Sequence, residues 1–306
     1  MKKRDPVLDA LNALSDLRHT SGAGAFACQP YLANRSNLVV AKAAKLAGDL
    51  RIADLVPTLA ATFHRLMADP AKLDKGCAAL TAIVEALYAL DYEDSDVYLA
   101  GARHVQMEGS FGPPVDAAAQ LRGDCALGLM RTRHPDALFE VVRLLADKEP
   151  PARIGAARAL GLAGETGELV LLLKTLSGDR EPDVLAECFS GMLASRTERS
   201  VAFVASYLDD EDPVVVESAA LALGASRLAQ AVATLRDKFA RTVQAPLRQV
   251  LLAALASARD DAALSFLRSL VAGADSRIAA EAVAALQPYR NDPRIRALLV
   301  SPPPSL

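Results

Sequence analysis

The chain has 306 residues, of which 52% are hydrophobic, and a formal net charge of −3 at pH 7. The apolar content is enough for a core, but only 5% of residues are aromatic and Trp is absent, so alanine and other small residues must fill the space between elements. The negative charge argues against nucleic-acid binding, which needs clustered cations, and no apolar run reaches the roughly 18 residues that a membrane span requires, so we expect a cytoplasmic protein.

The first part of the chain predicts helices of uneven length and spacing. Residues 1–24 are expected to form an N-terminal capping helix, over 6–18, and a loose turn at 21–25. Residues 25–133 are expected to hold divergent repeats, with helices over 37–48, 55–67, 76–90, 97–107 and 114–130. The connection at 108–114 is longer than those that follow it.

The second part of the chain repeats a short motif. One series of large apolar residues recurs every 31 or 32 positions, at Leu160, Met192, Leu223, Leu255 and Leu286. A second series recurs in the same way, at Leu145, Leu176, Leu208, Phe239 and Leu270. Because each copy carries two apolar segments, the repeating unit is predicted to be a helix pair.

These repeats divide residues 134–290 into five regular helix pairs. The predicted pairs are 135–146 with 150–163, 166–177 with 182–195, 198–209 with 213–224, 228–240 with 245–258, and 261–272 with 276–288. Gly164, Gly178 and Gly273 are expected to take the left-handed conformation that ends a helix. Residues 291–306 are expected to form a C-terminal cap and a Pro-rich tail. The whole chain, 1–306, is thus predicted to be a single all-α solenoid of about eight helix pairs.

Two segments resemble a known repeat family. Residues 147–164 (DKEPPARIGAARALGLAG) and 210–226 (DEDPVVVESAALALGAS) resemble the HEAT-repeat signature of an acidic residue, Pro, paired alanines and Ala-Leu-Gly. The resemblance is to bacterial HEAT-repeat, armadillo-like proteins, and it covers 134–290 closely and 25–133 more loosely. Arg153 and Arg248 match the family's ladder arginine, whereas Leu185, Val216 and Ala279 replace it in other repeats.

The resemblance implies an α-α superhelix that grips partners along a concave face, and some HEAT-like proteins are also enzymes. Hydroxylases similar to deoxyhypusine hydroxylase hold iron with His-Glu dipeptides, but no histidine here, at 19, 64, 104 or 134, precedes a Glu. His104 and Glu108, on one face of the predicted helix, make only a two-ligand site. The chain lacks the basic charge of alkylpurine DNA glycosylases and any motif of phycobilin lyases. We therefore predict that the chain is not an enzyme and uses no metal or cofactor.

The irregular region at 104–124 is the first candidate site. It concentrates polar groups where other repeats have short turns, among them His104, Gln106, Glu108, Asp116 and Arg122. Asp124 falls in a core column and is expected to be satisfied by Arg122 or by the backbone of the 109–114 loop. Two interpretations stay open: the region holds a deviant repeat in register, or it binds a partner.

The second candidate site is the concave face lined by second helices. Its predicted charged residues are Lys42, Lys45, Arg153, Arg158, Glu187, Glu217, Arg248 and Glu281. Acidic residues prevail over 165–217, which favours either a basic partner or simple helix capping. The predicted function is a non-catalytic scaffold or adaptor that binds another protein; the alternative is a HEAT-like, lyase-like enzyme or cofactor-binding subunit that uses the 104–124 region.

Overall fold

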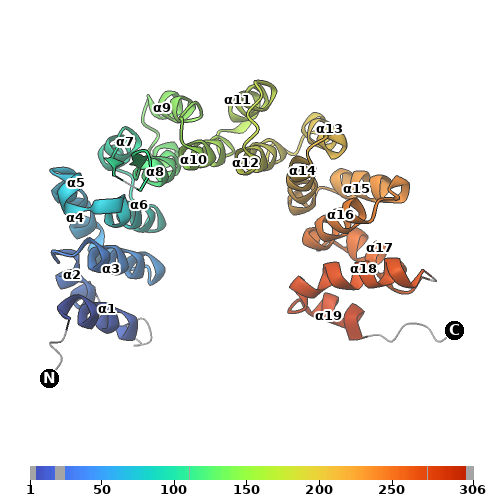
Figure 1. Cartoon of the computed structure of the whole chain (residues 1–306), viewed down its shortest axis with the longest axis horizontal. Coiled ribbons are helices and arrows are strands. Elements are labelled where there is room, and N and C mark those ends of the chain that lie inside the picture. Colours follow the sequence, from blue (N-terminus) through green and yellow to red (C-terminus); the bar gives the residue numbers. More distant parts are fainter. Residues whose placement is uncertain (1–4, 18–24, 110, 274, 301–306) are drawn as a thin grey trace. The chain divides into compact units, whose positions relative to one another are not determined.

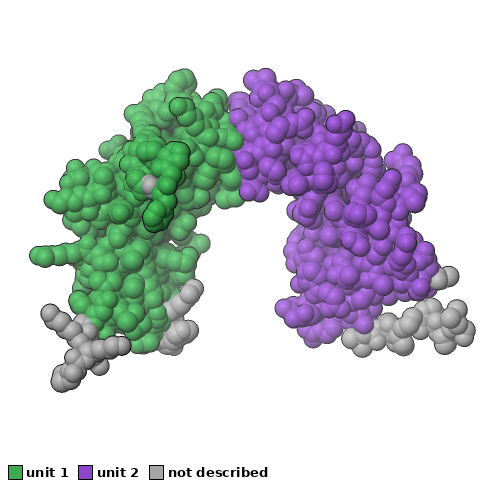
Figure 2. All heavy atoms as spheres, in the orientation of Figure 1, with its two compact units in different colours: residues 1–160 green, residues 161–306 purple. Residues whose placement is uncertain are grey.

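The computed structural model describes residues 5–17, 25–109, 111–273 and 275–300. The chain divides into two compact units, residues 1–160 and 161–306 (Figure 2). Each unit is a stack of helix pairs and is described by itself. The expected turn at 21–25 and the expected Pro-rich tail fall largely or wholly outside the described residues.

Unit 1 consists of two rows of helices and one small hairpin (Figure 1). Helices α3, α6, α8 and α10 pack in succession as the second-helix row, and α2, α4, α7 and α9 form the first-helix row. The elements are α1 (Pro6–Leu17), α2 (Ala25–Leu32), α3 (Asn37–Asp49), η1 (Ala53–Leu55), α4 (Val56–Met67), α5 (Pro70–Leu73), η2 (Lys75–Cys77), α6 (Ala78–Ala89), α7 (Ser95–Ala102), β1 (Met107–Glu108), β2 (Val115–Asp116), α8 (Ala119–Thr132), α9 (Ala137–Leu144) and α10 (Pro150–Leu160).

Unit 2 repeats the arrangement with greater regularity. Its second-helix row is α12, α14, α16 and α18, and α13, α15 and α17 pack in succession in the first-helix row. The elements are α11 (Gly164–Leu176), α12 (Pro182–Leu193), α13 (Glu198–Ser206), η3 (Tyr207–Asp209), α14 (Pro213–Ser226), α15 (Ala229–Arg241), α16 (Ala245–Ala258), α17 (Asp261–Val271), α18 (Ser276–Leu286), η4 (Gln287–Tyr289) and α19 (Pro293–Val300).

The observed elements confirm the predicted fold class, an all-α solenoid of helix pairs. Eight pairs are present in the described residues, from α2 with α3 to α17 with α18, and α1 and α19 flank them. That the pairs form one continuous solenoid stays a prediction, because the two units are described separately. In the part of the chain that the structure describes, no helix is both long enough and apolar enough to cross a membrane.

The apolar series of the second helices forms the core between neighbouring repeats. Each of its five members, from Leu160 to Leu286, is at most 1% exposed. The first-helix series departs from this at Leu176, which is 64% exposed. On α11 the core-facing positions are instead Glu168, Leu171 and Thr175, which recur at helical spacing.

The helix predicted over 97–107 is present but ends at Ala102, so that its predicted end was wrong. Helix α7 begins after Asp94, whose side chain accepts a hydrogen bond from the Asp96 backbone N–H, and it ends at Ala102. The chain then forms the antiparallel pair β1 and β2, in which Met107 lies opposite Asp116. Glycine and proline between the strands suit a turn and oppose a helix, so α8 begins only at Ala119. Helices α2 and α5 were not predicted.

Most second helices end on a residue in the left-handed conformation. The prediction was confirmed for Gly164 and Gly178, but Gly273 has no positive φ. At other repeats this position is held by a residue with a side chain, most often arginine: Arg51, Asp91, Arg133, Arg196, Arg227 and Arg259. A left-handed residue turns the chain out of the helix and toward the next first helix, and glycine pays the smallest steric cost for it.

Candidate functional site

The 104–124 region of unit 1 is organised around the buried guanidinium of Arg122. Its Nε and Nη2 donate hydrogen bonds to the two carboxylate oxygens of Asp147, at 2.9 and 3.0 Å. Its Nη1 lies 2.7 Å from Asp116 Oδ2 and donates to the backbone oxygen of His104 at 3.0 Å. Arg122 therefore joins α8, the hairpin and the segment before α10 in one network. Asp147 was not predicted to take part.

The hairpin is also anchored to the preceding helix pair, α4 with α6, through Gln106. This side chain is 4% exposed, and its Nε2 donates to the backbone oxygen of Asp74 at 3.1 Å and to Glu108 Oε1 at 2.6 Å. Asp74 is fully buried, and its carboxylate accepts hydrogen bonds from the backbone N–H groups of Ala79 and Leu80 at the start of α6. Gln106 thus ties the hairpin to the start of α6.

These contacts lower the pKa of two carboxyl groups of the region, Asp116 and Glu108. Burial raises the pKa of Asp116, but hydrogen bonds from the backbone N–H groups of Gln106 and Ala118 and from Arg122 outweigh it, so that the net pKa lies below its ordinary value. The pKa of Glu108 is lowered chiefly by the hydrogen bond from the Gly76 backbone N–H, at 2.7 Å. The observed contacts of Gln106, Asp116 and Arg122 are internal to unit 1, and these side chains support the hairpin.

Asp124 does not receive the partners expected for it. Arg122 is engaged elsewhere, and the Asp124 carboxylate accepts one hydrogen bond, from Gln120 Nε2 at 2.9 Å. Its second oxygen, Oδ2, is buried without a hydrogen-bond partner. Burial, to which the charge of Glu85 adds, raises the pKa of Asp124 to about 6. Asp124 is therefore a carboxyl group on α8 that can exchange a proton near neutral pH.

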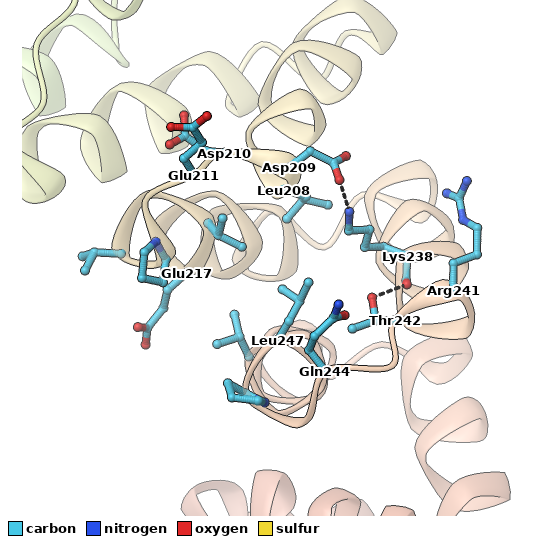
Figure 3. Close-up of a pocket in the computed structure, with 15 residues that line it drawn as sticks. Leu208, Asp209, Asp210, Glu211, Glu217, Lys238, Arg241, Thr242, Gln244 and Leu247 are labelled. Atoms are coloured by element: carbon cyan, nitrogen blue, oxygen red, sulfur yellow. Dashed lines mark hydrogen bonds and ion pairs between the residues drawn. The ribbon is translucent and has the colours of Figure 1, made fainter.

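Unit 2 contains a hollow that the sequence did not predict. It lies where the N-terminal turns of α14 and α16 face η3 and the end of α15, and it encloses about 650 Å³ (Figure 3). Its apolar wall includes Leu208, Val214, Val216, Leu247 and Val250. We call it the α14/α16 hollow.

A second hollow continues along the same row of helices. It lies between α12 and α14, encloses about 410 Å³ and is lined mainly by small and apolar residues, among them Ala186, Ser190, Leu221 and Ala225. Val214 and Glu217 line both hollows, so the two are adjoining parts of one surface. We call this surface, formed by α12, α14 and α16, the second-helix groove.

Apolar side chains in the groove are exposed to solvent. Val214 is 48% exposed and Leu221 is 38% exposed, seven positions further along α14. The opposite face of α14 contributes Val215, Ala219 and Leu223 to the core. A helix that is apolar on both faces is the signal by which the sequence could have indicated this groove, since a surface helix ordinarily has one polar face.

The groove carries more negative than positive charge. Asp209 is paired with Lys238, and Asp210 lies 3.3 Å from Arg180 Nη1. The carboxylates of Glu211 and Glu217 are exposed, and within the described residues neither forms an ion pair or a hydrogen bond. In Figure 3, Glu211 and Glu217 lie on the α14 side of the hollow, whereas Lys238 and Arg241 lie on the α15 side.

The other predicted face residues fall into two groups. Arg248 is buried and forms a bidentate pair with Glu281, at 3.0 and 2.8 Å, and Arg153 donates to the backbone oxygens of Asp147 and Lys148. Lys42 donates to the Leu11 backbone oxygen at 2.7 Å. Lys45, Arg158 and Glu217 are exposed, and Glu187 is half-buried. Of all predicted face residues, Glu217 alone lines either of the two hollows of the second-helix groove.

In the described ranges, no group of three or more His, Cys, Asp or Glu side chains is placed so that it could hold a metal ion. His104 and Glu108 do not share a helical face, because they lie in and beside the hairpin, and the His104 ring contacts Gln106 Oε1 at 3.1 Å.

Comparison with known proteins identifies the repeat and shows related folds. The family model described as HEAT repeats matches residues 169–256. No curated protein sequence matches the chain. Among solved structures, human deoxyhypusine hydroxylase, in complex with glycerol, is similar at 20% identity over 83% of this chain and 91% of that chain, with a TM-score of 0.32. The CpcE and CpcF complex of phycocyanin lyase from Nostoc sp. PCC7120 is similar at 18% identity over 90% and 92%, with a TM-score of 0.37. An engineered protein is similar at 14% identity over 95% and 94%, with a TM-score of 0.36.

These findings correct one prediction. The chain was predicted not to be an enzyme, on the ground that it lacks the His-Glu dipeptides of the hydroxylases, the basic charge of the glycosylases and any lyase motif. The prediction was wrong, because the solved structures to which the chain is similar include a hydroxylase and a phycocyanin lyase complex. At such identities the likeness concerns the fold alone.

Proposed function

Because residues 169–256 match the family model of HEAT repeats, we propose that the chain binds another protein and that the second-helix groove of unit 2 is the surface that receives it. The proposal rests on one observation. The groove presents solvent-exposed apolar side chains, chiefly Val214 and Leu221, across adjoining hollows on three successive helices. Contiguous exposed apolar surface with a charged rim is typical of interaction sites. The cytoplasmic location stays a prediction.

The shape of the groove favours a segment of a partner protein as the occupant. Helix α14 lies between α12 and α16, so an apolar strip beside it could receive an amphipathic helix or an extended segment. The small residues Ala186, Ser190 and Ala225 would let the backbone of such a segment approach closely. Other repeat proteins bind partners in this way, because their stacked helix pairs create long surfaces of adjoining grooves.

Photocrosslinking tests where the partner binds. A photoreactive amino acid would replace Leu221 in the full chain, in the cells that produce it, and a matched variant would carry it at Ala233, an exposed position on α15. We expect a discrete crosslinked species from position 221 and none of that mass from position 233. Equal crosslinking from both positions, or none from position 221, would contradict the proposal.

A second candidate function is chemistry or ligand binding at the 104–124 region, and Asp124 is the observation that favours it. A carboxyl group whose pKa is raised to about 6, and which has an unpartnered buried oxygen, is suited to general acid-base work. Native mass spectrometry of the protein purified from its own cells tests this candidate. A bound small molecule that Asp124→Asn releases would support it, whereas a mass equal to the chain alone for both proteins would count against it.

A further inference from the structure

We infer that the α14/α16 hollow recognises a Lys or Arg side chain flanked by apolar residues, so that the partner segment is basic and amphipathic. The inference rests on the proposed function and names the chemistry of the occupant.

The charge of the hollow is uncompensated on its α14 side. Asp209 and Asp210 each have a cationic partner in unit 2, Lys238 and Arg180. Glu211 and Glu217 have none among the described residues, and both are exposed at the wall of the hollow. A cation brought to either glutamate would complete the pattern of acid-base pairs that the neighbouring carboxylates already show. Complementary charge of this kind sets partner choice and association rate.

The apolar wall of the hollow favours a long basic side chain over a small inorganic cation. Val214 of α14, Leu247 of α16 and the buried Leu208 and Val216 line the same hollow as the two glutamates. Long basic side chains suit such a site, because their methylene stems lie on apolar surface while the charged head reaches the carboxylates. A flanking aliphatic residue of the partner would then fill the adjoining hollow over Leu221.

The competing preference of a helix N-terminus for anions is reduced at α14. The Asp212 side chain already accepts a hydrogen bond from the Val214 backbone N–H at 2.9 Å, so a carboxylate of the chain itself fills this position. Arg241, on the α15 side, donates its Nε to the Asp237 backbone oxygen at 3.1 Å. A bound cation is thus stabilised most on the α14 side of the hollow.

Selection from a displayed library of random 12-residue peptides, on the purified full chain, tests the inference. Three proteins would be compared: the wild type, the charge-reversed variant Glu211→Lys with Glu217→Lys, and the wall variant Val214→Asp with Leu247→Asp. Far-UV circular dichroism would first establish that all three are equally helical. Affinities of the selected peptides would be measured at low and at high salt.

We expect the wild type to enrich peptides with Lys or Arg beside aliphatic residues. Their affinity should fall at least tenfold on charge reversal and markedly at high salt. Enrichment of neutral or acidic peptides, or basic peptides that bind the charge-reversed variant equally well, would overturn the inference and leave the proposed function standing. If the wild type enriches nothing beyond what the wall variant enriches, the proposed function fails and the inference fails with it.

Discussion

The buried Arg122 of α8 and the half-buried Asp147, which precedes α10, form a bidentate pair in which Nε and Nη2 donate to separate carboxylate oxygens at 2.9 and 3.0 Å. Because the same guanidinium also contacts Asp116 at 2.7 Å, one side chain holds three segments together. Arg122→Met should therefore destabilise unit 1 by about 3–5 kcal/mol, since it leaves the buried carboxylate of Asp116 and the half-buried carboxylate of Asp147 without their cationic partner.

Urea unfolding followed by far-UV circular dichroism measures this loss of stability. Tryptophan fluorescence cannot be used, because the chain has no Trp. Lys45→Met is the matched control, because it removes the same charge from an exposed position on α3 and should change stability by no more than about 0.5 kcal/mol. Equal losses for the two variants would show that the Arg122 network does not stabilise the unit.

Asp124 should make stability depend on pH in a direction opposite to that of a paired carboxylate. Its folded-state pKa, about 6, lies above the ordinary value of 3.8, so the folded form binds the proton more tightly. The stability that Asp124 contributes to the folded state is fully present below about pH 4 and is lost as the pH rises through about 6. The free energy of unfolding should change by on the order of 2–3 kcal/mol over this range.

The difference in unfolding free energy between the wild type and Asp124→Asn isolates this contribution, because other groups titrate alike in both proteins. We expect the variant to gain stability relative to the wild type between pH 4 and pH 7. A difference that stays constant over this range would mean that folding does not raise the pKa of Asp124.

Gly155 and Gly123 lie where α8 and α10 approach backbone to backbone, and a Cβ on Gly155 would overlap the Gly123 main chain. Gly155→Ala should therefore cost roughly 1–3 kcal/mol, although alanine is the better helix former, because the two helices must move apart. Gly109→Ala is the control, since nothing lies within 4 Å of a Cβ at that position. Thermal unfolding of both variants would compare them, and a stabilised Gly155→Ala protein would contradict the packing described.

Arg227 has a φ of 54° at the end of α14, where glycine would be less strained. Arg227→Gly should raise stability by about 0.5–1 kcal/mol, whereas Arg227→Ala, which keeps a Cβ, should not. At the equivalent turn after α10, Gly164→Ala should lower stability by a similar amount, because φ there is 62°. If the glycine and alanine variants at 227 melt at the same temperature, the backbone is not strained there.

The sequence predicted the regular repeats well because their signals are local and periodic. Residues 245–258 were predicted as a helix and are α16 with the same bounds, since Gln244 and Pro246 mark its start and the apolar spacing its length. The left-handed turns at arginines escaped prediction because arginine has no intrinsic preference for that conformation; the packing of successive repeats imposes it.

The candidate sites were predicted less well, because their partners are distant in sequence. The region at 104–124 was singled out correctly as irregular, but the pairing of Arg122 with Asp147 depends on how α8 and α10 stack. Of the second-helix groove only Glu217 was predicted as a site residue, since Val214 and Leu221 were indistinguishable from core residues in a helix that is apolar all round. Whether an apolar side chain is buried is decided by the neighbouring helices.

The affinity of the crosslinked partner for two charge variants tests the central claim most directly. Leu221→Asp places a carboxylate in the second-helix groove, and Ala233→Asp places one on the exposed side of α15. Isothermal titration of the purified partner should show at least a tenfold weaker Kd for Leu221→Asp and an unchanged Kd for Ala233→Asp. Binding that survives Leu221→Asp but is lost with Ala233→Asp would contradict the account.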